Sequence, residues 1–150
     1  MKIIVDANIV FSGVLNSNGK IGDLLINSGE IFSFIAPVFL RTEIYNHHKK
    51  LMDISGLTLR QIFESEYQIC KFITFISEEQ IDEKSWRFAD ELTRDIDPKD
   101  LIYMAYAKQF NCSLWTGDKK LIKGLAQKKH YNILTTDDLF FIRHNWLIGQ

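Results

Sequence analysis

Short apolar segments alternate with longer segments of helical periodicity along the whole chain, and this alternation limits the fold more than any other feature. The five predicted strands are rich in Ile, Phe, Val or Leu and cover Ile3–Val5, Ile31–Ala36, Phe72–Ile76, Ser113–Thr116 and Asn132–Thr135. The predicted helices cover Gly19–Asn27, Pro37–Met52, Leu57–Cys70, Glu78–Leu92 and Asp100–Phe110. Strands that alternate with helices favour an α/β fold in which helices cover both faces of a parallel sheet.

The size and composition of the chain suit one domain. The 150 residues include 46% hydrophobic residues and only two prolines, so they can form a core and leave no linker-like tract. We therefore expect residues 1–150 to form a single domain. No apolar run approaches the roughly 18 residues of a membrane span, and the N-terminus does not resemble a signal peptide, so we expect a cytoplasmic protein without a membrane partner. Cys70 and Cys112 belong to no CxxC pair and are predicted to be buried thiols.

Two of the predicted strands are followed by an aspartate. Asp6 follows the first strand in MKIIVDAN, and Asp118 follows the fourth in SLWTGDKKL. Right-handed crossovers bring the carboxyl ends of all parallel strands to one edge of the sheet, where ligands bind. Asp6 and Asp118 are therefore expected to meet at that edge.

Two further acids are predicted to lie near the same edge, each on a helix with apolar neighbours. Glu43 lies about two turns into the helix after the second strand, and Asp100 opens the helix before the fourth strand. Two carboxylates about 4 Å apart repel by roughly 4 kcal/mol at an effective dielectric constant near 20, so four converging acids need a cation or a proton. Each acid alone is also consistent with a turn, a helix cap or an exposed position.

Oxygen ligands from Asp and Glu suit Mg²⁺ or Mn²⁺. Such an ion polarises a phosphodiester and lowers the pKa of a bound water. The four acids together therefore predict metal-dependent phosphodiester hydrolysis. Around them, Asn8 is predicted to hydrogen-bond Asp6 and Thr116 to hydrogen-bond Asp118, unless both are plain turn residues. Asp97 is interpreted as a helix-capping residue close enough to Asp100 to line the site.

At this point the sequence resembles the PIN domain, the fold of many bacterial toxin nucleases of toxin–antitoxin pairs. The resemblance covers essentially the whole chain and rests on three stretches in order: IIVDANIVFSGVL, LRTEI and DPKDLIYMAYAKQFNCSLWTGDKKL. It implies a three-layer α/β/α sandwich with a short parallel sheet in the strand order 3-2-1-4-5. It also implies a Mg²⁺- or Mn²⁺-dependent endoribonuclease that leaves a 5′-phosphate and a 3′-hydroxyl, with RNA as substrate and an antitoxin protein as a partner.

The resemblance carries over to individual positions. The four metal-binding and catalytic acids of the family correspond, in order, to Asp6, Glu43, Asp100 and Asp118. Asn8 and Thr116 match positions that line the site. The assignment of the third acid leaves Asp97 as the alternative to Asp100, and the phase of the following helix favours Asp100.

Charge is unevenly distributed along the chain. The net charge of −1 gives no overall attraction to nucleic acid, but five lysines and no acid lie between Lys119 and Lys129. Lys119 and Lys120 directly follow Asp118 and are predicted to bind RNA phosphates. Arg41 is a further predicted RNA-binding residue, with His47 and His48 as weaker candidates. The alternative is that these residues only form solvated helix faces.

Other functions fit the sequence less well. A phosphatase of the haloacid dehalogenase type needs a second Asp where this chain has Asn8, and a receiver domain needs an Asp after the third strand. A Rossmann-type domain needs a glycine-rich loop after the first strand, and DANIVFSG has none. A non-catalytic PIN-like module that binds RNA or protein, and a housekeeping RNA-processing nuclease, remain open. The apolar residues Leu139–Gly149 are predicted to form a last core helix, with a homodimer surface as the alternative.

Overall fold

The computed structural model describes residues 1–130 and 132–150. Within them, five strands form one sheet in which every neighbouring pair is parallel and the order is β3-β2-β1-β4-β5. The strands are β1 (Lys2–Val5), β2 (Ser33–Pro37), β3 (Ile73–Ile76), β4 (Ser113–Trp115) and β5 (Ile133–Leu134). The predicted α/β class and the strand order 3-2-1-4-5 are confirmed.

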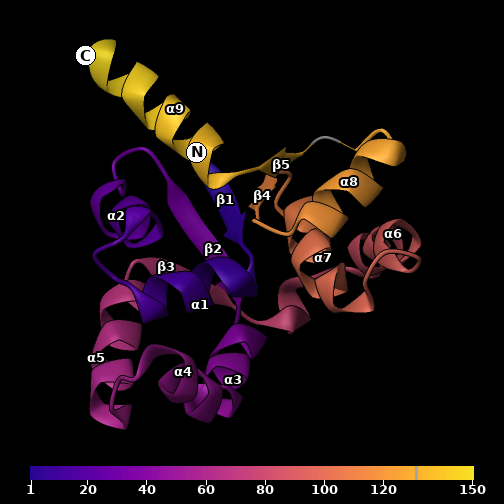
Figure 1. Cartoon of the computed structure of the whole chain (residues 1–150). Coiled ribbons are helices and arrows are strands. Elements are labelled where there is room, and N and C mark those ends of the chain that lie inside the picture. Colours follow the sequence, from indigo (N-terminus) through magenta and orange to yellow (C-terminus); the bar gives the residue numbers. More distant parts are fainter. Residues whose placement is uncertain (131) are drawn as a thin grey trace.

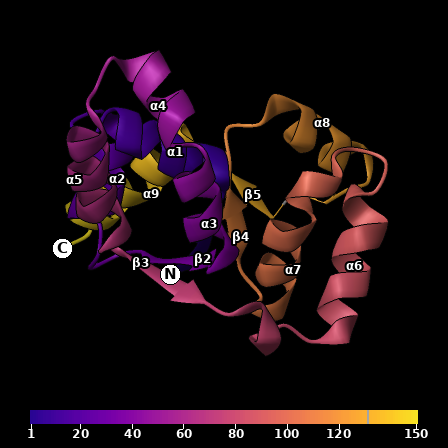
Figure 2. The same ribbon diagram turned by 90° about the horizontal axis from the view of Figure 1, so that it is seen from below.

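Helices cover both faces of this sheet, which gives the molecule three layers (Figures 1 and 2). One face carries α1 (Ala7–Leu15), α2 (Lys20–Asn27), α3 (Phe39–Asn46), α4 (His48–Ser55), α5 (Leu59–Cys70) and α9 (Thr136–Ile148). The other face carries α6 (Glu83–Thr93), α7 (Leu101–Gln109) and α8 (Lys119–Gln127). Two short 3-10 turns, η1 (Glu78–Gln80) and η2 (Pro98–Asp100), precede α6 and α7.

The sheet separates two hydrophobic cores because successive side chains of a strand point to opposite faces. In β1, Ile3 and Val5 pack into the core under α1 and α5, whereas Ile4 packs into the core under α7. As predicted, α7 is buried on most sides, including Met104 and Ala105. This helix, held between the sheet and α6, fixes the position of the residues at its N-terminus.

The predicted helix Pro37–Met52 is wrong, because the structure contains two helices there. Pro37 is the last residue of β2, α3 ends at Asn46 and α4 begins at His48. Between them His47 has φ −102° and ψ 6°, and its Nδ1–H donates to the backbone carbonyl of Glu43 at 2.7 Å. This side-chain contact accompanies the break between the two helices. The break places the His47 ring against the ring of Phe11 in α1, with the centroids 5.3 Å apart.

The predicted helix Glu78–Leu92 is also divided. The turn η1 ends at Gln80, and α6 starts only after Asp82, whose side chain accepts a hydrogen bond from the backbone N–H of Ser85 at 2.7 Å. An aspartate at this position stabilises a new helix start because it satisfies a backbone donor that has no partner within the helix. The following helix therefore begins later than predicted.

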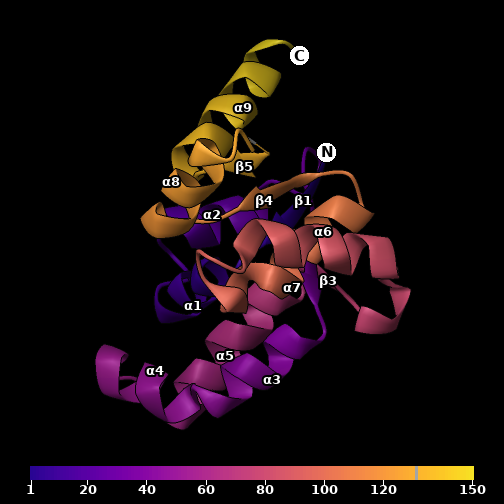
Figure 3. The same cartoon turned by 90° about the vertical axis from the view of Figure 1, so that its right-hand side faces the viewer.

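The C-terminal helix α9 extends away from the body of the molecule (Figures 1 and 3). Near its start Leu139 is fully buried, and Arg143 donates to Asp23 and Ser28 near α2. Beyond this contact Leu147 and Ile148 are 57% and 70% exposed. The prediction of a last core helix therefore holds only for the first half of α9.

Two other predictions concern the thiols and the membrane. Cys70 is buried and Cys112 is half-buried, and neither forms a disulfide. Burial raises the pKa of the Cys70 thiol to about 11, so this side chain stays protonated at neutral pH. No helix among the described residues has the length and apolar character needed to cross a membrane.

Candidate active site at the carboxyl edge of the sheet

The carboxyl ends of the central strands open into a cleft of about 1230 Å³. One wall is formed by residues of α1, α3 and α4, and the other by residues of η2 and α7. All four acids predicted from the sequence line this cleft, namely Asp6, Glu43, Asp100 and Asp118. The fold therefore brings together side chains from four segments that are far apart in the sequence.

Asp6 is held directly after β1. Its backbone N–H donates to the Trp115 carbonyl at 3.1 Å, which continues the pairing of β1 with β4 by one residue. Its side chain is 4% exposed and accepts a hydrogen bond from the Thr116 hydroxyl at 2.7 Å. Burial raises the pKa of Asp6, and the charges of Asp118 and Glu43 add to this effect, although the Thr116 bond opposes it.

Asp100 is the least satisfied of the four acids. It closes η2, is 7% exposed, and has no hydrogen-bond partner for Oδ2 among the described residues. Burial raises its pKa to about 7, and the charges of Asp6, Asp118 and Asp97 contribute in the same direction. A buried carboxylate with an unpaired oxygen costs free energy unless a proton or a cation compensates it.

Glu43 and Asp118 are each fixed by a different kind of donor. The Tyr103 hydroxyl of α7 donates to Glu43 of α3 at 2.7 Å, so this bond crosses the cleft. The Asp118 side chain accepts from the backbone N–H groups of Lys120 and Leu121 at 2.9 and 3.1 Å, which caps α8. A helix cap was the alternative interpretation of Asp118. In the structure Asp118 both caps α8 and lines the cleft.

The donor set fits a hard divalent cation, although the four acids are not yet gathered around one point. Among the described residues no group of three or more His, Cys, Asp and Glu side chains converges closely enough to hold a metal ion. Three of the acids are instead held by protein donors, and mutual repulsion opposes a closer approach. The unpaired Oδ2 of Asp100 and the purely oxygen character of the set are what Mg²⁺ or Mn²⁺ requires of its ligands.

The sequence matches the family model described as "PIN domain" over residues 4–138. This chain belongs to the PIN domain family. PIN domains are typically nucleases, which are hydrolases, and generally use divalent metal ions. No curated protein sequence matches the chain.

Two solved structures share the fold of this PIN domain. One is a crystal structure of VapBC2 from Rickettsia felis bound to a DNA fragment from their promoter, with 15% identity, a TM-score of 0.62, and coverage of 90% of this chain and 97% of that one. The other is PAE2754 from Pyrobaculum aerophilum, with 16% identity, a TM-score of 0.66, and coverage of 100% and 91%. At this level of identity the likeness concerns the fold alone.

The residues predicted to surround the acids of the PIN domain occupy partly different positions. Thr116 is fully buried, and its hydroxyl forms the predicted hydrogen bond with Asp118 by accepting from the Asp118 backbone N–H at 3.1 Å. The same hydroxyl also donates to the Asp6 carboxylate, which was not predicted. Asn8 lines the cleft but its side chain makes no hydrogen bond to Asp6 within the described chain. Asp97 lines the cleft and caps η2 by accepting from the Lys99 N–H at 3.0 Å, as predicted.

The predicted RNA-binding residues divide into two groups. Lys119 and Lys120 are exposed at the start of α8 beside Asp118, and the Lys120 charge acts against the raised pKa of Asp100. Arg41 is not brought to the cleft, because its guanidinium stacks on the ring of Phe75 in β3 at 3.9 Å. His48, a weaker candidate, does not line the cleft either: it is 8% exposed and pairs with Glu66 of α5 at 2.8 Å.

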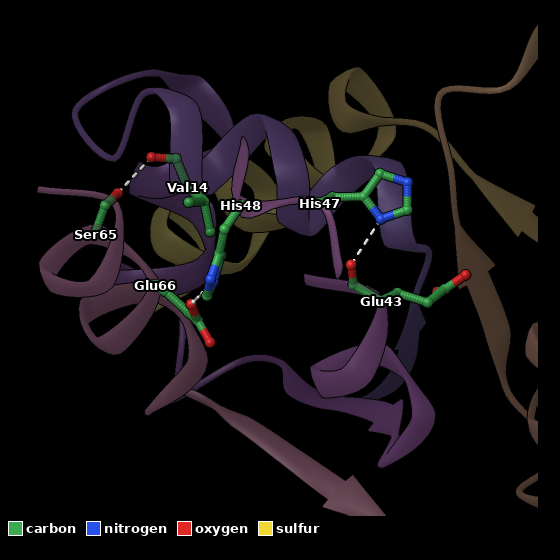
Figure 4. A network of polar contacts seen from close by, with 6 residues as sticks. All are labelled: Val14, Glu43, His47, His48, Ser65 and Glu66. Carbon is green, nitrogen blue, oxygen red and sulfur yellow. Dashed lines mark hydrogen bonds and ion pairs between the residues drawn. The ribbon is translucent and has the colours of Figure 1, made fainter. Parts of the chain in front are cut away.

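Figure 4 shows why the two neighbouring histidines differ. His48 points toward α5 and Glu66, whereas the His47 ring stands over the backbone carbonyl of Glu43 and lines the cleft. Lys50, Thr42 and Tyr103 also line the cleft, and sequence reasoning assigned them no role there. Lys50 follows Glu43 by seven residues and His47 follows it by four, a spacing that keeps all three on one side of a helix, so the sequence carried a signal for Lys50.

Proposed function

We propose that this PIN domain is a metal-dependent endoribonuclease that hydrolyses RNA phosphodiester bonds with Mg²⁺ or Mn²⁺ held by Asp6, Glu43, Asp100 and Asp118. The observation that carries this proposal is the state of Asp100. It is buried, its Oδ2 has no partner, and its acidic neighbours help to raise its pKa to about 7. A divalent cation would compensate the repulsion between the acids and bind the free Oδ2 while Asp100 stays ionised.

The residues around the acids hold the ligands in place. Thr116 orients Asp6, Tyr103 orients Glu43, and the first N–H groups of α8 orient Asp118. Outer hydrogen bonds of this kind fix the direction of a ligand and tune its affinity. When bound, the ion would supply charge stabilisation at the phosphate and a lowered pKa for water.

Cleavage of end-labelled single-stranded RNA by the purified protein tests this proposal. We expect cutting with Mg²⁺ or Mn²⁺ and none with EDTA, with products that carry a 5′-phosphate and a 3′-hydroxyl. The variants Asp6→Asn and Asp100→Asn should lose the activity, whereas Asp137→Asn should keep it because Asp137 is exposed in the first turn of α9, outside the cleft. Metal-independent cutting, or full activity of a folded Asp6→Asn protein, would contradict the proposal.

We further propose that the chain is the toxin of a toxin–antitoxin pair. The support is its resemblance to the toxin nucleases of the PIN family, together with the fold that it shares with VapBC2. Co-expression with the protein encoded beside it should give a stable complex in which RNA cleavage is inhibited. An active nuclease without such a partner would favour a housekeeping RNA-processing role, and RNA or protein binding without cleavage under any metal would favour a non-catalytic module.

A further inference from the structure

The cleft extends beyond the four acids into an arm between two helices of the same layer. We call this region the α1/α4 arm and define it by Phe11 and Leu15 of α1 and by His47, Lys50 and Leu51 at the start of α4, all of which line the cleft. The arm is continuous with the carboxylates because the His47 Nδ1–H donates to the Glu43 carbonyl at 2.7 Å. A ligand that lies across the carboxylates can therefore run into the arm.

The arm differs in charge from the opposite end of the cleft. Its lining contains the cation Lys50 and no acid, whereas Glu78 and Asp97 accompany Lys99 near η1 and η2. A polyanionic strand is attracted to cations and repelled by carboxylates that no ion neutralises. The distribution of charge therefore favours the arm as the path of a nucleic-acid strand away from the acids.

The contact between His47 and Glu43 also fixes which ring nitrogen of His47 can meet a ligand. A carbonyl oxygen only accepts hydrogen bonds, so Nδ1 carries the proton that is donated to Glu43. Nε2 lies on the side of the ring away from that bond (Figure 4). The ring is further held by its contact with Phe11 at a centroid distance of 5.3 Å.

Phe11 gives the arm a surface on which a base can stack. Its side chain is half-buried, packs against the core on one side and lines the cleft on the other. From Phe11 to Leu15 the face of α1 that lines the arm covers about 6 Å at roughly 1.5 Å per residue. This exceeds the ~3.4 Å between stacked nucleotides of one strand, so the arm has room for at least one nucleotide.

We propose that the α1/α4 arm is a nucleotide-binding subsite for single-stranded RNA, in which one base stacks on Phe11, Lys50 binds the adjacent phosphate, and the Nε2 of His47 accepts a hydrogen bond from the ribose 2′-hydroxyl. The proposal rests on the proposed function for the choice of RNA as ligand. It deepens that function by specifying an unpaired strand, because a base within a duplex is stacked on its neighbours and cannot lie on Phe11. An apolar protein segment would use Leu15 and Leu51 but would leave Lys50 unused.

Fluorescence anisotropy with a labelled single-stranded RNA of about ten nucleotides tests this subsite. All proteins carry Asp100→Asn, so that binding is measured without cleavage. Adding Phe11→Leu should weaken binding about tenfold, while Phe11→Tyr should preserve it because the ring is retained. Lys50→Gln should weaken binding and reduce the slope of log affinity against log salt by about 0.7, whereas the matched control Lys49→Gln, exposed on α4 outside the cleft, should change neither.

The comparison with duplex RNA and with cleavage separates the outcomes. Duplex RNA of the same sequence should bind more weakly and should not respond to Phe11→Leu. If Phe11→Leu and Lys50→Gln bind like Lys49→Gln, or if these variants impair only the capture of a protein partner, the subsite is refuted. If the variants show the expected binding pattern but the unmutated protein does not cleave RNA, the subsite is supported and the nuclease activity is refuted. If the unmutated protein cleaves RNA but the variants do not show the pattern, the nuclease activity is supported and the subsite is refuted.

Discussion

At Asp100, burial and the neighbouring acids act in the same direction and raise the pKa to about 7, compared with about 3.9 for an Asp in an unfolded chain. Between these two values the folded protein binds more protons than the unfolded one. The stability of the metal-free protein must therefore fall as the pH rises from about 4 to about 7, and the loss remains at higher pH.

Asp100→Asn should remove this dependence. We expect the variant to be more stable than the unmutated protein in EDTA, and the difference in the free energy of unfolding should be roughly 2 kcal/mol larger at pH 8 than at pH 5. Urea denaturation at the two pH values measures this, with Asp137→Asn as the control for loss of an exposed acid. An equal difference at both pH values would show that the Asp100 carboxyl is not the group that titrates.

A second prediction at the residue scale concerns the pair formed by Thr116 and Asp6. Thr116→Val replaces the one side-chain donor to the Asp6 carboxylate among the described residues by a methyl group and should destabilise the protein by about 1–3 kcal/mol. Thr116→Ser keeps the hydroxyl and should therefore lower the free energy of unfolding by less than Thr116→Val does. The penalty of Thr116→Val, measured by chemical denaturation, should shrink in an Asp6→Asn background; an unchanged penalty would mean that it arises from packing alone.

The sequence predicted a hydrogen bond between Thr116 and Asp118 but missed the one from Thr116 to Asp6, and strand register explains the difference. The apolar runs identify Asp6 and Asp118 as strand-end residues without any knowledge of the pairing. The bond from Thr116 to Asp6 depends on the alignment of Val5 with Trp115 in β1 and β4, which places the next residues of the two strands side by side. Register of this kind is a tertiary property that local patterns do not encode.

At the scale of elements, the bond between Tyr103 and Glu43 joins α7 to α3 across the cleft. Tyr103→Phe removes the donor while retaining the ring, so it should leave the fold intact and lower metal affinity or metal-dependent cleavage about 10- to 100-fold. Tyr106→Phe is the matched control, because its hydroxyl donates to the Ile76 carbonyl and the residue does not line the cleft. Equal activity of the two variants would remove Tyr103 from the proposed site.

The elements that sequence reasoning misjudged are those that depend on contacts between helices. A continuous helix over Pro37–Met52 agrees with the local periodicity, but the bond of His47 to the Glu43 carbonyl and its contact with Phe11 accompany a break. Lys50 lines the cleft together with Glu43, as the spacing of seven residues between them would also predict for an unbroken helix. The break depends on tertiary contacts and could not be predicted, whereas the position of Lys50 could have been predicted from its spacing.

For the molecule as a whole, the four acids come from the end of β1, from α3, from η2 and from the residue that caps α8. Because these segments belong to both helical layers, an ion bound by all four must oppose unfolding of the whole domain. At Mg²⁺ or Mn²⁺ concentrations about 100 times Kd, the stabilisation should be roughly 2.7 kcal/mol, which corresponds to a rise in Tm of about 5–10 °C.

Thermal unfolding monitored by circular dichroism, with and without the ion, measures this rise independently of any RNA. The Asp100→Asn variant should start from a higher Tm in EDTA but gain much less on addition of metal, because it has lost both a repelling charge and a ligand. Asp137→Asn should gain as much as the unmutated protein. If both variants gain equally, the ion binds elsewhere, and the four acids would then have to be assigned a role that does not involve a shared cation.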